Sequence, residues 1–343
     1  MKQGGRIAAI ITALVLYSGT ANEGEHAKIR MQRHAAKEEA QGLEEIVQEP
    51  SPFRGIPVFP GATPQDYKEL RELYQRLIFE KGADLSYANE LFSSEKLRLD
   101  ARIPKLLKRN FMSKADKGEL SWSEVYKRNR IDVLEKKAKK FFEQYREHLE
   151  AAAEKYGVDA RVITGILGEE TGFGHRQFRG DYSWPATFMT IYARSGSKRW
   201  KEFALRELAS LIKYARIKGI PADKLYDEKS SYAGAYGMGQ FIPSSLLETF
   251  VGKSGRIEDA DPWDVVDNIY AVANYLANNT RRVKDENGKF HSGRWKPGEG
   301  WDVGARKGNY WAVRAYNNSH TYARIVFHIA SSIPENKAGK PDR

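Results

Sequence analysis

The stretch that decides the fold is DARVITGILGEETGFG, residues 159–174. Asp159 is a good helix N-cap, because its short carboxylate can accept a hydrogen bond from the first turn. Gly157 lies just before it and favours the end of a preceding helix. The pattern therefore predicts a new helix that begins close to residue 160.

The apolar residues of this helix predict where its two carboxylates point. Ile163, Ile166 and Leu167 recur at helical spacing, and Glu170 follows on the same face. At about 100° per residue, Glu170 lies roughly 15° from the centre of the apolar stripe and Glu169 about 110° away. We expect Glu169 to be exposed and Glu170 to be buried or half-buried, with a pKa raised toward the range useful for a general acid. A structural Glu bonded to backbone is the alternative.

A second stretch, SYAGAYGMGQF at residues 231–241, reads as a loop of small residues that ends in Gln240 and Phe241. Its glycines let a backbone approach a substrate closely. A desolvated carboxylate beside such a loop is typical of proteins that cleave bonds between sugars.

Composition excludes several classes of site. The chain of 343 residues has no cysteine, which excludes disulfides, thiolate catalysis and Cys-based metal sites. Its seven histidines show no zinc-ligand spacing, so we expect no metal and no cofactor. Hydrophobic residues make up 41% of the chain, enough for a substantial core.

The N-terminus predicts export. A cationic segment, MKQGGR, precedes an apolar stretch that is short for a membrane span, and residues 19–21 offer a cleavage site. We interpret residues 1–21 as a signal peptide and residues 22–55 as a flexible linker, which makes the mature protein soluble and periplasmic or associated with the cell wall. The alternative is an uncleaved segment that gives weak membrane association.

The net charge of +11 constrains the partner. Loss of residues 1–21 would remove Lys2 and Arg6 and leave +9. An exported basic protein suits a polyanionic partner such as peptidoglycan, whose peptide stems carry carboxylates. Because no nucleic-acid-binding signature is present, we expect no nucleic acid partner.

Helical periodicity dominates the rest of the chain and predicts a mainly α fold without internal repeats. The expected helices are 65–81, a short one after Ser86, 123–156, 200–217, 243–250, 264–279 and 320–332. A small hairpin is expected within 281–300, around Asn287-Gly288.

Four blocks in order resemble the membrane-bound lytic transglycosylase B family of peptidoglycan lytic transglycosylases, glycoside hydrolase family 103. They are Gly-Val at 157–158 with Glu-Thr-Gly-Phe-Gly at 170–174, SYAGAYGMGQFIPSS at 231–245, Val-Ala-Asn-Tyr at 272–275, and YNNSHTY at 316–322. The resemblance implies a lysozyme-like helical catalytic core with a small additional helical subdomain. We assign the catalytic domain to 56–333 and a disordered tail to 334–343, and we expect a monomer.

The resemblance also implies a reaction. The family cleaves the β-1,4 bond between N-acetylmuramic acid and N-acetylglucosamine and leaves a 1,6-anhydromuramic acid end. Glu170 would act first as acid and then as base, since the attacking 6-hydroxyl is already part of the substrate.

Substrate-binding residues carry over from the same blocks. Ser231 matches a serine near the reacting N-acetyl group, and Asn317 an asparagine beside the oxocarbenium-like centre. Gln240 and Phe241 match groove residues that hold sugar rings and acetamides.

Tyr275, Tyr316 and Tyr322 match aromatics that line the subsites; core packing with a satisfied hydroxyl is the alternative for each.

Two departures from the family pattern stand out. An expected arginine pair appears as Lys198-Arg199, so contacts to the muramyl peptide or lactyl group would differ. Residues 251–264 lack the ligand spacing of the calcium loop that some members carry, and we expect no calcium there.

Two other functions remain open at this point. A hydrolytic muramidase would use Glu170 with a water-activating carboxylate such as Asp181 or Asp264. A catalytically silent peptidoglycan-binding scaffold is the second, and the intact set of Glu170, Ser231 and Asn317 argues against it.

Overall fold

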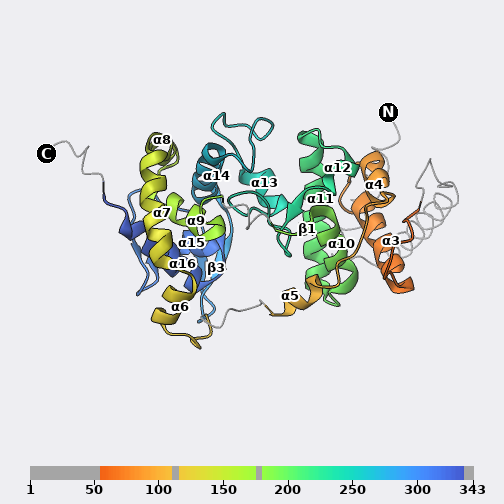
Figure 1. Ribbon diagram of the computed structural model, residues 1–343, viewed down its shortest axis with the longest axis horizontal. Coiled ribbons are helices and arrows are strands. Elements are labelled where there is room, and N and C mark those ends of the chain that lie inside the picture. The colour runs from red at the N-terminus through yellow and green to blue at the C-terminus, as the bar shows by residue number, and fades with distance from the viewer. Residues whose placement is uncertain (1–54, 110–115, 175–179, 336–343) are drawn as a thin grey trace, which may run out of the picture. The chain divides into compact units, whose positions relative to one another are not determined.

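The computed structural model describes residues 55–109, 116–174 and 180–335, and it is mostly helical (Figure 1). The expected signal peptide, nearly all of the expected linker, and residues 336–343 of the expected tail lie outside these ranges. Within the ranges, no helix is both long enough and apolar enough to cross a membrane.

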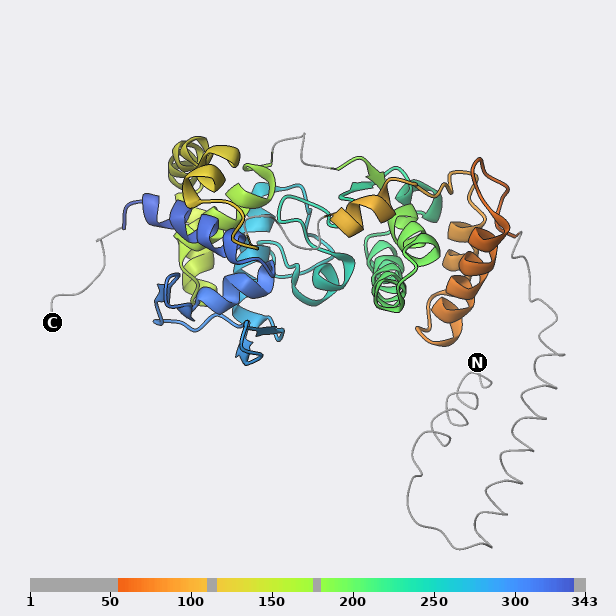
Figure 2. The same ribbon diagram turned by 90° about the horizontal axis from the view of Figure 1, so that it is seen from below.

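One group of helices combines the first helices described with a segment from the middle of the chain. Its members are α3 (Pro64–Phe79), α4 (Leu85–Phe92), α5 (Ile103–Arg109), α10 (Trp184–Arg194), α11 (Lys198–Ile217) and α12 (Ala222–Leu225). Helix α10 packs on α11, α3 and α5, and α12 packs on α4. Figure 2 shows α3 in orange beside α10 and α11 in green.

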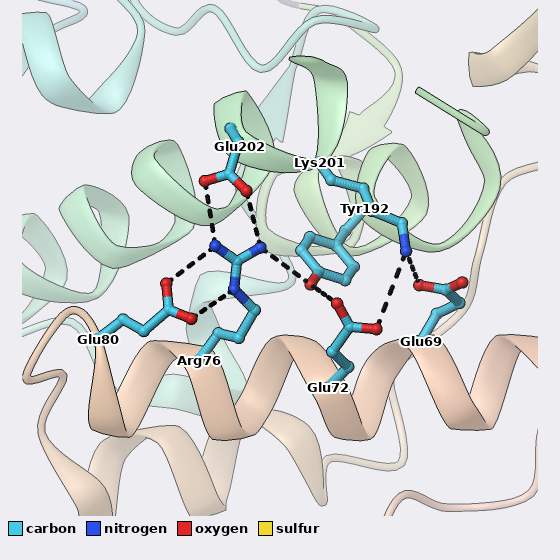
Figure 3. Close-up of polar contacts among 7 residues, drawn as sticks. All are labelled: Glu69, Glu72, Arg76, Glu80, Tyr192, Lys201 and Glu202. Carbon is cyan, nitrogen blue, oxygen red and sulfur yellow. Dashed lines mark hydrogen bonds and ion pairs between the residues drawn. The ribbon is translucent and has the colours of Figure 1, made fainter. Parts of the chain in front are cut away.

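Charged side chains join α3 to α10 and α11 (Figure 3). Arg76 pairs with Glu80 at 2.8 Å and with Glu202 at 2.9 Å, and it donates to the hydroxyl of Tyr192 at 3.4 Å. That hydroxyl donates in turn to Glu72 at 2.7 Å. Lys201 adds ion pairs to Glu69 and Glu72. The contacts fix the register of α3 against its neighbours.

A second group surrounds the predicted helix that carries Glu170. Its members are α6 (Trp122–Arg128), α7 (Ile131–Gln144), α8 (Arg146–Tyr156), α9 (Ala160–Thr171), α14 (Val265–Asn278), α15 (Tyr310–Tyr316) and α16 (His320–Ser332). Helix α13 (Pro243–Thr249) contacts both α11 and α14.

Among the described residues, three antiparallel strand pairs accompany the helices. They are β1 (Tyr182–Ser183) with β2 (Lys229–Ser230), β3 (Arg282–Lys284) with β4 (Phe290–Ser292), and β5 (Trp301–Asp302) with β6 (Lys307–Gly308). The β3–β4 pair confirms the hairpin predicted within 281–300.

The prediction of one long helix over 123–156 is wrong, because the segment forms α6, α7 and α8. Arg130 adopts a left-handed conformation, with φ of 52°, between the first two. Tyr145, with φ of −114°, separates the second from the third. Strong helix formers therefore do not ensure continuity where packing requires the chain to turn.

Helix α10 was not predicted, and its burial explains why. Of its 11 residues, nine are buried, from Trp184 to Tyr192. A helix covered on every side has no polar face and therefore no amphipathic period. Helices α5, α12 and α15 were also missed; each has seven residues or fewer, too short for a periodic signal.

Candidate active site

Helix α9 is held at its start by local chemistry, as the sequence predicts. The carboxylate of Asp159 accepts from the backbone N–H of Arg161 at 2.8 Å, and Gly157 ends α8 in a left-handed conformation. Further along, Gly165 lies against α16: a Cβ added there would meet the carbonyl oxygen of Val326 at 2.6 Å. This glycine permits a close approach of the two helices.

Glu170 lies in the last turn of α9 and is half-buried, as predicted. The hydroxyl of Tyr322, from α16, donates to its Oε1 at 2.8 Å. Desolvation raises the pKa of Glu170 to about 8, although the Tyr322 hydrogen bond acts in the opposite direction. The carboxyl group is therefore protonated at neutral pH and is poised to give up a proton.

The prediction that Glu169 is exposed is wrong. Its side chain is half-buried, and desolvation raises its pKa to about 7. The reason is that α9 contacts α16, α7, α14 and α8, so neighbours cover more than its apolar stripe. The negative charge of Glu169 also contributes to the raised pKa of Glu170.

The chain leaves α9 through three successive left-handed residues. Gly172, Phe173 and Gly174 have φ values of 56°, 68° and 81°. Such a conformation costs a non-glycine residue about 1–3 kcal/mol. Phe173 is retained there because its ring packs on Phe141 at 4.7 Å and covers Gly168. Strain at this position is consistent with a functional site.

The first half of the 231–241 loop is a tight turn built on Ser231. The Ser231 hydroxyl accepts from the N–H groups of Ala233 at 3.3 Å and Ala235 at 3.0 Å. Trp184 of α10 donates its indole N–H to the carbonyl of Gly234 at 2.9 Å. The half-buried Ser231 hydroxyl is therefore held in place by the backbone around it.

The second half of the loop is bonded directly to the end of α9. Tyr236 and Phe241 form an isolated antiparallel bridge, and Gln240 adopts φ of 50° within it. The Gln240 amide donates to the carbonyl of Gly237 at 2.9 Å. The hydroxyl of Thr171, next to Glu170, donates to the carbonyl of Met238 at 3.1 Å.

Sequence reasoning missed the residues that support this loop from behind. The fully buried Asn268 of α14 accepts from the N–H of Gly239 at 3.0 Å and donates to the carbonyl of Pro262 at 2.9 Å. That carbonyl also accepts from the N–H of Met238 at 2.8 Å. The available signal was an amide on the predicted inner face of 264–279, where a buried polar group needs partners.

Aromatic side chains converge beside Glu170. Tyr316 and Tyr322 have nearly parallel rings, 4° apart in orientation with centroids at 6.4 Å. Tyr316 donates to the carbonyl of Gly239 at 2.5 Å and contacts Tyr275 and Phe241 at 4.7 and 5.7 Å. Tyr275 and Phe241 are only 4% and 3% exposed, and the Tyr275 hydroxyl donates to a backbone carbonyl. Tyr275 and Phe241 therefore pack behind Tyr316 in this structure.

The remaining predicted residues lie on exposed surface. Asn317 caps the end of α15. Lys198 and Arg199 form the first turn of α11, which packs on α10, α13 and α3. Over the part of the chain that the structure describes, no three His, Asp or Glu side chains cluster closely enough to hold a metal ion.

Comparison with known proteins assigns the family. A family model described as a transglycosylase SLT domain matches residues 65–303. The chain belongs to this transglycosylase SLT family. It is 36% identical over 137 residues to the membrane-bound lytic murein transglycosylase B of Escherichia coli strain K12. That match covers 40% of this chain and only 36% of the relative's length.

Solved structures share the family's fold. The soluble lytic transglycosylase SltB1 of Pseudomonas aeruginosa has a TM-score of 0.59 at 21% identity, over 77% of this chain and 97% of that one. SltB3 from the same organism, in complex with NAG-anhNAM-pentapeptide, has a TM-score of 0.58 at 20% identity, over 79% and 80%. The predicted lysozyme-like helical fold is thereby confirmed.

Proposed function

We propose that this protein is a peptidoglycan lytic transglycosylase with Glu170 as its single catalytic acid and base. It cleaves the β-1,4 bond between N-acetylmuramic acid and N-acetylglucosamine and leaves a 1,6-anhydromuramic acid end. The observation that carries the proposal is the Glu170 carboxyl, half-buried, bonded to Tyr322 and with a pKa raised to about 8. Family membership and a relative solved with NAG-anhNAM-pentapeptide support this substrate class.

One proton moves twice in this reaction. Protonated Glu170 gives its proton to the glycosidic oxygen as the bond from that oxygen to C1 of muramic acid breaks. The resulting carboxylate then takes the proton of the 6-hydroxyl as that oxygen bonds to C1. No water enters, and Glu170 ends protonated again. A pKa close to neutral suits both steps, and the Tyr322 hydroxyl stabilises the transient carboxylate.

The placement of other carboxylates favours this reaction over hydrolysis. An inverting hydrolase needs a second carboxylate across the sugar from the acid to activate water. Asp181 is exposed, and Asp264 is exposed and caps α14 by accepting from the N–H of Asp267 at 2.9 Å. Asp264 is therefore already engaged in the helix cap, and Asp181 lies on exposed surface.

Polar side chains around the loop supply complementary contacts for a sugar. Ser231 already accepts two backbone N–H groups, so its hydroxyl would meet an N-acetyl group as a donor. The Gln240 amide nitrogen is engaged with Gly237, which leaves its oxygen to accept from an acetamide N–H. Asn317 supports the developing positive charge near C1, and Lys198 and Arg199 bind carboxylates of the peptide stem further away.

Half-buried Tyr316 lines the sugar site, and Tyr322 borders it beside Glu170, to which its hydroxyl donates. Tyr275 and Phe241 support Tyr316 from behind. Export to the periplasm, as residues 1–21 predict, would bring the protein to this substrate. The protein works there as a soluble monomer.

Product analysis tests the reaction. Digested peptidoglycan should give fragments with anhydro ends, which mass spectrometry finds one water lighter than reducing ends. Fragments with reducing ends would identify a muramidase instead. Absence of fragments would leave only the wall-binding scaffold.

Variants test the residues. Glu170→Gln should abolish fragment release while binding to isolated sacculi is retained; release at the wild-type rate would show that Glu170 is not the acid. Asp181→Asn and Asp264→Ser, the second chosen because serine also caps helices, should both stay active. Loss of activity in either would favour a water-activating carboxylate.

A further inference from the structure

Three backbone carbonyl groups converge on one lysine outside the site described above. Lys218 follows α11 as its C-cap, and its Nζ donates to the carbonyl oxygens of Glu258 at 2.6 Å, Ala260 at 2.9 Å and Ile257 at 3.4 Å. Lys218 is half-buried and Ala260 is 1% exposed. The ammonium group thus lies within a cage of carbonyl oxygens.

The number of carbonyl oxygens equals the number of N–H donors on the ammonium group, and their dipoles stabilise its positive charge. A lysine has three N–H donors, and three carbonyls accept them. The nearby carboxylates of Glu258 and Asp259 pair instead with Arg256, at 3.9 and 3.0 Å. The positive charge is therefore balanced by carbonyl dipoles and by the C-terminal end of α11, where a cation is favourable.

The caged segment is part of a loop, residues 252–262, which Asp267 of α14 also binds through its carboxylate. One carboxylate oxygen accepts from the N–H of Lys253 at 2.9 Å and the other from the N–H of Asp261 at 2.8 Å. Gly252 lies so close that a Cβ there would meet Asp267 Oδ1 at 2.3 Å. Asp267 and Lys218 together fix both ends of the loop.

The loop delivers a carbonyl to the active site. Two residues after Ala260, the carbonyl of Pro262 accepts from the N–H of Met238 at 2.8 Å. The carbonyl of Met238 accepts from the hydroxyl of Thr171, the neighbour of Glu170, at 3.1 Å. Three hydrogen bonds, joined by short stretches of backbone, therefore connect the ammonium of Lys218 to the end of α9.

We infer that Lys218 is a positioning residue: its ammonium group keeps the 252–262 loop folded and thereby holds the backbone of Met238 and Gly239 against Thr171 and Glu170. It touches no reacting atom. Its effect on turnover rests on the proposed function, whereas its effect on the loop does not.

Chemical rescue tests the requirement for a cation. Lys218→Ala removes the atoms of propylammonium, so that ion should fit the vacated space. We expect kcat for fragment release to fall about 10- to 100-fold, as a small misplacement of catalytic groups does, with less effect on KM. Propylammonium chloride should restore much of the lost kcat. Neither 1-propanol, which lacks the charge, nor tetramethylammonium chloride, which lacks the N–H donors, should restore it. Equal rescue by propanol, or no rescue, would overturn the inference.

Hydrogen exchange tests the loop without any assay of activity. In Lys218→Ala the Met238 and Asp261 amides should exchange at least ~10-fold faster, because Met238 donates to the Pro262 carbonyl of the loop and Asp261 is itself a residue of the loop. Propylammonium should slow them again. The Trp184 amide, bonded to the carbonyl of Glu228 at 3.0 Å, should not change.

Two controls make the exchange result decisive. Lys213→Ala, at an exposed position on the same helix, should leave both the exchange and the kcat unchanged. Unchanged Met238 exchange in Lys218→Ala would overturn the inference. So would equal acceleration at Trp184, which would indicate a global loss of stability. If exchange responds as expected but the wild-type protein releases no anhydro fragments, the proposed function fails and the role of Lys218 in the loop stands.

Discussion

Replacement of Glu170 by glutamine should stabilise the protein, and by an amount that depends on pH. The pKa of this carboxyl is about 8 in the folded chain against an ordinary value of 4.5. Between those two pH values the folded state binds more protons than the unfolded state, so stability falls as pH rises. Glutamine is neutral throughout and can still accept from the Tyr322 hydroxyl, so the variant escapes this loss.

The structure gives the size of the effect. Each pKa unit corresponds to about 1.4 kcal/mol. Linkage between 4.5 and about 8 then predicts that Glu170→Gln gains about 1 kcal/mol over wild type at pH 5, about 3 at pH 7 and about 5 at pH 9. These are upper figures, because the folded chain can relax around a charge.

Urea unfolding of both proteins at the three pH values measures this difference, provided that the m-values agree. Glu147→Gln, exposed on α8, serves as the matched control and should stay within about 0.5 kcal/mol of wild type at every pH. A difference for Glu170→Gln that does not widen from pH 5 to pH 9 would refute the claim that this carboxyl is desolvated.

Three further changes test the same region. Tyr322→Phe removes the hydrogen bond that lowers the Glu170 pKa, so the loss of kcat/KM at alkaline pH should move up by about one to two pH units; a shift downward would contradict this. Glu169→Gln removes a repelling charge, so the alkaline loss of kcat/KM should move to lower pH. A pH profile of kcat/KM identical to that of the wild type would show that the two carboxyls are uncoupled. Gly165→Ala places a Cβ 2.6 Å from the Val326 carbonyl and should cost about 1–2 kcal/mol, seen as a lower Tm, despite the better helix propensity of alanine.

Local chemistry made helix α9 predictable. Gly157 and Asp159 mark a helix boundary because a left-handed cap and a side-chain cap depend only on residues close in sequence. Periodicity likewise placed Glu170 on the covered face. It failed for Glu169 because a pattern gives the direction of a side chain relative to its own helix, whereas burial depends on how many neighbours surround that helix.

The sequence by itself determined a half-buried carboxylate at a helix end, the glycine-rich loop and the mainly helical fold. Only the tertiary structure decided which groups set the chemistry of the acid. Tyr322 lies 152 residues from Glu170 along the chain, and Lys218 reaches its carbonyl cage 39 to 42 residues away. Desolvation and long-range hydrogen bonds arise from packing between segments, and no local pattern encodes which segments meet.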